Sequence, residues 1–448
     1  MRKLCLKNGQ AVIDDALLPV DICIEDGKIA AIGNAEAFGL TSDDEVVDCS
    51  GKIILPGVID AHCHIQLDTG IFATQDDWGA GSCEAAKGGV TTVIDFVGPQ
   101  PGEDLCDALH ERRDQAMASI IDYTFHMTAL DASEKTLQSI AKCPEWGISS
   151  LKLYTTYRPN YYLDDASILK ILEVAKEAGL TTLIHCENDA IVSSETAKHA
   201  DEDVLRAYPD MRPAMAEAEA AERMIRLAQY AQARIVIAHN SCAETAKIVA
   251  QARMRGAQVF NETAPQYMFL SADDNKLSPE PWRYILQPPL RDVSNNEALQ
   301  RSVLFGDVDM VITDHCAYTR AQKTSSKSSI PGGLPGLQTL LPLTASIPGM
   351  TWPKLARVLS RNPAKIYGLW PKKGAIAPGF DADIVILRDE SFVIDESKLR
   401  SFAEYSPFHG HSARGIVETV IRRGSIIAQN GEICTALGTG AFIAASTH

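Results

Sequence analysis

Short apolar runs rich in β-branched residues recur along the middle of the chain, and longer amphipathic stretches separate them. Eight such runs can be distinguished: 57–64, 90–97, 122–129, 149–156, 181–188, 234–241, 257–264 and 309–316. In the intervals apolar residues recur at helical spacing, most clearly over 165–179 and 216–233. Strands that alternate with helical crossovers form parallel sheets, and eight units predict a closed (β/α)8 barrel of the α/β class.

The two ends of the chain have a different pattern, in which Gly turns separate short β runs and no helical stretch intervenes. The clearest runs are 21–33 near the start, and 380–390 and 415–433 near the end. We therefore expect a small β-sandwich domain built from both termini, residues 1–54 plus 372–448. Residues 55–371 would then form the barrel domain.

Composition and charge narrow the choice of partners. With 448 residues, of which 46% are hydrophobic, the chain can bury a large core. The formal net charge is -16 and there is no basic run, so we expect neither nucleic acid nor a membrane surface as a partner. The N-terminal segment lacks the apolar stretch of a signal peptide, and the cysteines form no C-x-x-C pair. We expect a cytoplasmic protein without disulfides that acts on a small molecule.

Residues of the kinds that bind metal ions lie at the ends of the predicted strands. His62 and His64 end the first run and project to the same face, because side chains at i and i+2 of a strand do so. In a (β/α)8 barrel the C-terminal strand ends form the active-site face, where residues distant in sequence meet. The full set is His62, His64, Lys152, His185, His239 and Asp314. Imidazoles combined with a carboxylate are typical ligands of zinc and similar ions, so we predict a metal site.

Other histidines and cysteines near this pattern receive simpler interpretations. Outside it lie His110, His199 and His448, which we expect at the surface or in structural roles. His126, at the end of the third run, stays open between a structural and a ligand role. Strand alternation turns Cys63 and Cys186 away from the ligand face, and Cys316 is interpreted as a small buried apolar residue.

Lys152 differs from the rest of the set, because an ammonium group would repel a metal ion. Burial of its charge is costly, so either the charge is removed or the side chain reaches solvent. A neutral amine reacts with carbon dioxide to give a carbamate, which is anionic and offers two oxygens. At this point the residues leave both interpretations open.

Seven ordered motifs resemble those of one enzyme family. They are GVIDAHCH (57–64), LKLYTTY (151–157), HCEN (185–188), AHNSCAE (238–244), NETAPQYMFL (261–270), PPLRD (288–292) and ITDHC (312–316). Together they resemble the cyclic amidohydrolases, specifically the hydantoinase and dihydropyrimidinase group of the amidohydrolase superfamily. Residues 364–387 resemble that family's return into its sandwich domain, so the likeness covers nearly the whole chain.

The resemblance implies a dinuclear centre and a hydrolytic reaction. It assigns one divalent ion, with zinc as the first choice, to His62, His64 and Asp314, and a second to His185 and His239. A carbamylated Lys152 would bridge the two ions, and a metal-bridged hydroxide would open a cyclic amide. Asp314 would act as acid and base, and Tyr157 would hydrogen-bond the developing oxyanion. Similar enzymes are tetramers or dimers, so a homo-oligomer is expected.

The same resemblance assigns substrate contacts, and here the chain departs from the family pattern. Backbone groups near Gln287 and Gly332 match positions that hold the amides of the ring. Relatives usually have a small residue at the first position and Asn at the second. These differences put the shape of the pocket and the preferred ring substituent in question.

Two other functions are compatible with these motifs. One is an allantoinase or a dihydroorotase; dihydroorotases carry Arg where this chain has Gln66, although Arg291 offers another cation. The other is a non-catalytic scaffold, which relatives become when ligands are lost; all six ligand positions are filled here. We therefore expect a hydrolase that opens a hydantoin or dihydropyrimidine ring.

Overall fold

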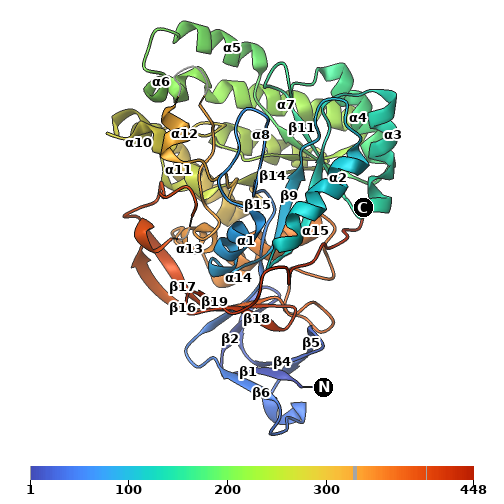
Figure 1. Ribbon diagram of the computed structural model, residues 1–448, viewed down its shortest axis with the longest axis vertical. Coiled ribbons are helices and arrows are strands. Elements are labelled where there is room, and N and C mark those ends of the chain that lie inside the picture. Colours follow the sequence, from blue (N-terminus) through green and yellow to red (C-terminus); the bar gives the residue numbers. More distant parts are fainter. Residues whose placement is uncertain (1, 326–329, 400) are drawn as a thin grey trace.

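The computed structural model describes residues 2–325, 330–399 and 401–448, and most of the chain forms a barrel with its covering helices (Figure 1). Parallel strands follow one another in sequence order from β8 to β15. They are β8 (Val58–Asp60), β9 (Val90–Val97), β10 (Asp122–Thr128), β11 (Ser150–Tyr154), β12 (Thr181–His185), β13 (Arg234–Ile237), β14 (Val259–Thr263) and β15 (Met310–Val311). The predicted (β/α)8 fold is confirmed, and each strand lies within one of the predicted runs.

Backbone hydrogen bonds between the segments that follow β8 and β15 close the barrel. The N–H of Asp314 donates to the carbonyl of His62 at 2.9 Å, and the N–H of His64 donates to the carbonyl of His315 at 2.8 Å. Because the closure occurs just beyond the two strands, it brings the first histidine pair and Asp314 side by side.

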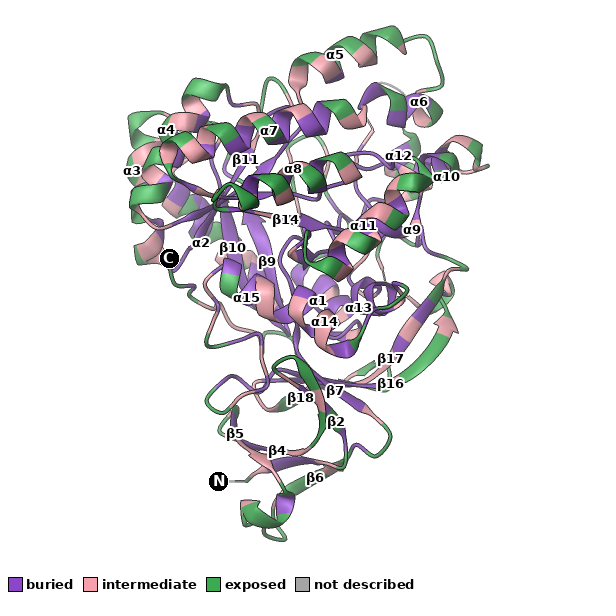
Figure 2. Ribbon diagram, turned by 180° about the vertical axis from the view of Figure 1, so that it is seen from behind, coloured by how far each residue is buried: buried purple, intermediate pink, exposed green. Residues whose placement is uncertain are grey.

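Helices cover the outside of the barrel, with buried faces toward the strands and exposed faces toward solvent (Figure 2). The longer ones are α1 (Trp78–Lys87), α2 (Leu105–Gln115), α3 (Glu134–Lys142), α4 (Asp165–Glu177), α5 (Asp189–Lys198), α6 (Val204–Met211), α7 (Ala214–Ala231), α8 (Ala243–Met254) and α11 (Val293–Phe305). Shorter ones are α9 (Pro265–Phe269), α10 (Ala272–Leu277), α12 (Arg320–Thr324), α13 (Leu340–Ala345), α14 (Trp352–Ala356) and α15 (Asn362–Ile366). Among the described residues, no helix combines the length and apolarity needed to cross a bilayer.

Helix α4, one of the two helices predicted from periodicity, illustrates why these segments are helical. The side chain of Asp164 accepts a hydrogen bond from the N–H of Ser167 at 2.8 Å, which caps the start of α4. Within α4 the buried side chains are Ile168, Ile171, Leu172 and Ala175. This spacing forms a single apolar stripe, and that stripe packs on the barrel.

Strands from both termini form two further sheets beside the barrel, as predicted. One contains β5 (Lys28–Gly33), β4 (Asp21–Glu25), β1 (Leu4–Lys7) and β6 (Glu45–Asp48). The other contains β19 (Glu432–Ile433), β18 (Ser425–Gln429), β17 (Ser412–Arg422), β16 (Ile384–Val393), β7 (Ile53–Pro56), β2 (Gln10–Ile13) and β3 (Ala16–Pro19). Leu6, Ile22, Ile54 and Ile384 belong to one buried cluster, so the two sheets share a core. The division at 54/55 and 371/372 stays a proposal; β7 crosses the first of these boundaries.

Two connections join the terminal strands to the barrel. Lys373 is buried, and its Nζ lies 2.8 Å from Oδ2 of Asp122 in β10 and also contacts the carboxylate of Asp383. The last residues of the chain leave the sandwich and run along the barrel, where the N–H of Tyr123 donates to the carbonyl of Ala441 at 3.0 Å. The C-terminus accordingly lies beside the barrel helices, far from the N-terminus (Figure 1).

Candidate metal centre

The six predicted ligand residues meet at the C-terminal end of the barrel strands. His62 and His64 follow β8, Lys152 lies within β11, and His185 is the last residue of β12. His239 and Asp314 lie just beyond β13 and β15. All six line a single cavity of about 330 Å³.

His62, His64 and Asp314 direct three potential ligand atoms toward one point. Oδ1 of Asp314 lies 3.4 Å from Nε2 of His62 and 3.3 Å from Nε2 of His64. Ligand atoms of a tetrahedral zinc ion, with bonds of about 2.05 Å, are separated by about 3.35 Å. Burial lowers the pKa of His62 well below its usual value, so its imidazole is neutral, which is the ligand form. The three residues therefore fit one divalent ion.

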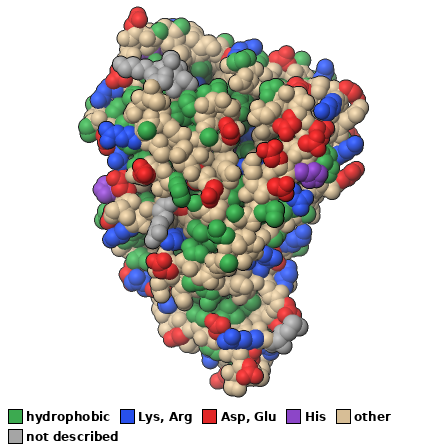
Figure 3. All heavy atoms as spheres, in the orientation of Figure 1, with side chains coloured by type: hydrophobic (Ala, Val, Ile, Leu, Met, Phe, Trp, Pro, Cys, Tyr) green, Lys and Arg blue, Asp and Glu red, His purple; other side chains and the backbone are tan. Residues whose placement is uncertain are grey.

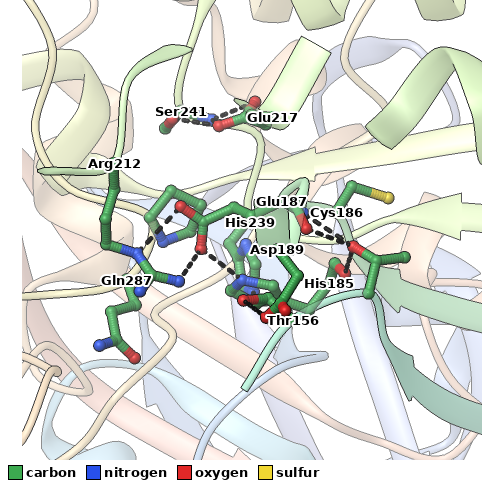
Figure 4. A network of polar contacts seen from close by, with 12 residues as sticks. Thr156, His185, Cys186, Glu187, Asp189, Arg212, Glu217, His239, Ser241 and Gln287 are labelled. Carbon is green, nitrogen blue, oxygen red and sulfur yellow. Dashed lines mark hydrogen bonds and ion pairs between the residues drawn. The ribbon is translucent and has the colours of Figure 1, made fainter. Parts of the chain in front are cut away.

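His185 and His239 form a second pair in the cavity. Nδ1 of His185 lies 2.9 Å from Nε2 of His239, somewhat closer than two tetrahedral zinc ligands. On the other side of its ring, Nε2 of His185 lies 2.7 Å from Oε2 of Glu187, a carboxylate that Arg212 also binds (Figure 4). Nε2 of His185 therefore carries the proton and donates it, which leaves the lone pair of Nδ1 directed at His239.

Glu187 is ionised in spite of its burial. Burial alone would raise its pKa, but the Arg212 guanidinium and His185 outweigh that effect and bring the pKa of Glu187 to about 2. The Nε of Arg212 lies 3.1 Å from Oε1 of Glu187, and its Nη2 contacts Oε2. The paired geometry fixes both the carboxylate and the tautomer of the histidine.

Lys152 lines the same cavity as the two histidine pairs and is 1% exposed, which excludes the solvent-exposed interpretation. Its Nζ is 5.3 Å from the centre of the Phe96 ring and 5.1 Å from that of Tyr154. Burial lowers the pKa of Lys152 to about 8, although Glu262 and Asp314 act in the opposite direction. In the described part of the chain no carboxylate lies within ion-pair distance of Nζ. No ion pair therefore holds Lys152 in its charged form.

Glu262 is a further buried carboxylate that the sequence interpretation missed. It lies in β14, its Oε1 contacts Nδ1 of His62, and the N–H of His239 donates to the same oxygen at 3.3 Å. Burial raises the pKa of Glu262 to about 8, against the opposing effect of Lys152. Glu262 thus contacts one member of each histidine pair.

Several residues of the site have backbone angles that are rare outside glycine. The φ angles are 32° for His239, 51° for Asp314 and 74° for Tyr157. Such angles cost conformational energy and persist where the surroundings impose them, which is common at functional sites. All three side chains line the cavity.

The predicted substrate-contact residues also line the cavity. Tyr157, Gln287 and Gly332 are all part of its wall. The ring of Tyr157 is centred 4.8 Å from that of His185, and burial raises the pKa of the Tyr157 hydroxyl well above its usual value. The phenol is therefore a hydrogen-bond donor at neutral pH.

The residues left aside by the sequence interpretation have structural partners. His126 is buried and uses both nitrogens, with Ser150 Oγ at 2.7 Å and the Ala61 carbonyl at 2.9 Å, which makes it a structural residue. Cys186 points away from the histidine pair, as strand alternation predicts (Figure 4). His315, which carried no prediction, donates to Asp76 at 3.0 Å beneath the site.

A barrel whose strand ends gather imidazoles, a buried lysine and a carboxylate into one cavity has the architecture of metal-dependent barrel enzymes. Comparisons with known proteins specify the family. The model of the amidohydrolase family matches residues 53–427. A D-hydantoinase of Streptomyces coelicolor is 35% identical, over 99% of this chain and 98% of that protein. A D-phenylhydantoinase of Escherichia coli O9:H4 is 35% identical over 98% of both chains.

Solved structures agree with the sequence comparisons. The crystal structure of a dihydropyrimidinase from Brevibacillus agri has a TM-score of 0.95 and 30% identity, over 99% of both chains. The chain belongs to the amidohydrolase family. Membership implies a dinuclear metal centre, for which the residues at the strand ends are the candidate ligands.

Proposed function

We propose that this protein hydrolyses the ring amide of a hydantoin or a dihydropyrimidine. The observation that carries the proposal is the convergence of all six ligand residues on one cavity of about 330 Å³, large enough for a small ring. Relatives that cover nearly the whole chain include a D-hydantoinase and a D-phenylhydantoinase. The filled ligand positions, together with similarity along nearly the whole chain, support the same class of reaction.

The ligand set supports two divalent ions, with zinc as the first choice. His62, His64 and Asp314 would hold one ion, His185 and His239 the other, and a carbamylated Lys152 would join them. The separations around Asp314 fit zinc, and burial lowers the pKa of Lys152 to about 8, which increases the fraction of neutral amine, the form that reacts with carbon dioxide. When bound, two such ions lower the pKa of water and polarise a carbonyl group.

The residues of the chain supply the proton transfers and the orientation. Water adds across the amide: a C–O bond forms, the C–N bond breaks, and one proton of the water must reach the leaving nitrogen. Asp314 faces the cavity and is the group that takes this proton from the water and passes it to the leaving nitrogen. The Tyr157 hydroxyl donates to the carbonyl oxygen as negative charge develops on it. Backbone groups at Gln287 and Gly332 would hold the amides of the ring.

Dihydroorotate, whose ring carries a carboxylate, is a poorer candidate substrate. Oε1 of Gln66 accepts a hydrogen bond from the backbone N–H of Trp78 at 3.3 Å. The side chain of Gln66 is therefore engaged away from the cavity. Arg291 is buried and binds Ser241 Oγ at 2.9 Å and Glu217. Arg158 lines the cavity but pairs with Asp189 at 2.8 Å. These cations are already compensated, which favours a neutral ring.

Allantoin, whose ring is neutral, remains the alternative substrate. A scaffold role would require the loss of at least one metal ligand.

The expected partners are small molecules and further copies of the chain. On the face seen in Figure 3 acidic side chains are interspersed with Lys and Arg, so the described residues there present no extended basic surface for nucleic acid. A cytoplasmic homo-oligomer, a tetramer or a dimer, is the form we propose. The mass of the protein in solution tests the proposed oligomeric state.

A substrate screen tests the proposed function. Purified protein with measured metal content is assayed on dihydrouracil, a 5-substituted hydantoin, allantoin and dihydroorotate, and kcat/KM is compared. We expect the hydantoin or dihydrouracil to give the highest value. A lead for allantoin or dihydroorotate would overturn the substrate assignment, and inactivity on all four with both ions bound would overturn the proposed function.

A further inference from the structure

One wall of the cavity carries a restrained amide side chain. Gln287 lines the cavity next to Pro331, Gly332 and Gly333. Its Nε2 donates a hydrogen bond to the hydroxyl of Tyr208, a buried residue of α6. A flexible side chain is thereby held at its far end. Among the described residues nothing else binds the carboxamide, so one N–H and its carbonyl oxygen can contact a ligand.

Gly332 faces this side chain so closely that a larger residue would press against it. A Cβ added at position 332 would lie 3.0 Å from both Cγ and Cδ of Gln287 and 3.4 Å from its Nε2. Carbon atoms in good contact are about 3.5–4.0 Å apart. Gly332 does not have the positive φ that favours glycine, whereas the next residue, Gly333, has a φ of 151°. The backbone therefore permits a larger residue at 332, but the restrained side chain of Gln287 would have to shift by a few tenths of an ångström to admit it.

We propose that Gln287 and Gly332 act as one specificity-determining unit. The carboxamide of Gln287 occupies the space that a side chain at 332 would fill, and it hydrogen-bonds the ring-amide edge that is not cleaved. The inference rests on the proposed function and specifies its substrate class: cyclic amides whose ring nitrogens carry hydrogen. A methyl group on that edge would both displace the restrained carboxamide and remove a hydrogen-bond donor of the ring.

The first test compares hydantoin with 1-methylhydantoin, which keeps the cleaved bond and adds one methyl group. We expect the wild-type protein to prefer hydantoin in kcat/KM by at least about 10-fold, the usual scale for one misplaced carbon. Q287A should reduce that preference to within about 2-fold, and Tyr208→Phe, which only releases the side chain, should reduce it partly. An unchanged preference in Q287A would overturn the inference alone. Wild-type inactivity on every cyclic amide, with both ions bound, would overturn the proposed function and this inference with it.

The second test measures whether positions 287 and 332 are coupled. Gly332→Ala should lower kcat/KM for hydantoin about 10-fold in the wild-type background, and by less than about 2-fold when combined with Q287A, because the collision is then absent. Gly336→Ala is the matched control, since its added Cβ would lie no closer than 3.5 Å to Thr313, and it should have no effect. Equal losses for Gly332→Ala in both backgrounds would contradict the coupling.

Discussion

Oε2 of Glu187 lies 2.7 Å from Nε2 of His185, and Arg212 binds the same carboxylate from its other side. The arrangement fixes the proton of His185 on Nε2 and turns Nδ1 toward His239. Hydrogen-bonded carboxylates of this kind orient histidine ligands and increase their basicity.

Glu187→Gln should therefore weaken metal binding at the His185 and His239 pair by about 10–100-fold, because the amide accepts a weaker hydrogen bond from Nε2 and leaves the Arg212 charge uncompensated. Zinc titration of the stripped variant measures the affinity. Glu222→Gln is the matched control, since Glu222 pairs with Arg226 on α7 outside the cavity. Equal effects of the two substitutions would show that Glu187 does not orient His185.

Lys152→Ala should lose both metal and activity, because the alanine side chain can form no bridge between the two histidine pairs. Metal content and turnover are measured on the same sample. Addition of short carboxylic acids should restore part of both, since a free carboxylate can replace the carbamate. Full metal content and full activity in the variant would contradict the bridging role.

Asp314→Asn should reduce kcat at least about 10²-fold, because an amide oxygen is a very weak proton acceptor. Oδ1 of Asp314 also lies at ligand distance from His62 and His64, so metal occupancy must be verified before the rates are compared. Near-normal rates with both ions bound would remove Asp314 from the proton transfers.

Lys373→Met should destabilise the fold by about 3–5 kcal/mol, because it leaves the buried carboxylate of Asp383 without its cation, whereas Asp122 keeps its contacts with Arg422 and Arg423. The free energy of unfolding from urea titrations measures the loss. Lys398→Met, which removes an exposed partner of Asp395, should cost less than about 1 kcal/mol. Similar losses for the two variants would show that the Lys373 cluster does not anchor the sandwich to the barrel.

The barrel could be predicted because its strands are buried on both faces, which produces short continuous apolar runs that end in polar residues. The convergence of His62 and Asp314 followed from barrel topology, since the first and last strands are neighbours. β15 could not be predicted at its true length of two residues, because the chain leaves the sheet early and turns at Asp314 with a positive φ. That turn depends on the backbone bonds to the segment after β8.

The residues that support the site were harder to identify. Glu187 lies two positions after His185, so strand alternation could have placed both on one face, and the HCEN motif contained the signal. Arg212 gave no such signal, since it lies between α6 and α7 and meets Glu187 only through tertiary packing. The contact between Gln287 and Gly332 is likewise a property of two loops that are distant in sequence.

The central claim, a dinuclear site that opens a cyclic amide, is tested most directly by zinc titration of metal-stripped protein while ring opening of hydantoin or dihydrouracil is followed. The account predicts negligible turnover without metal and a plateau at two ions per chain, with Lys152 intact. Full activity at one ion per chain, activity in the stripped protein, or no ring opening with two ions bound would contradict it.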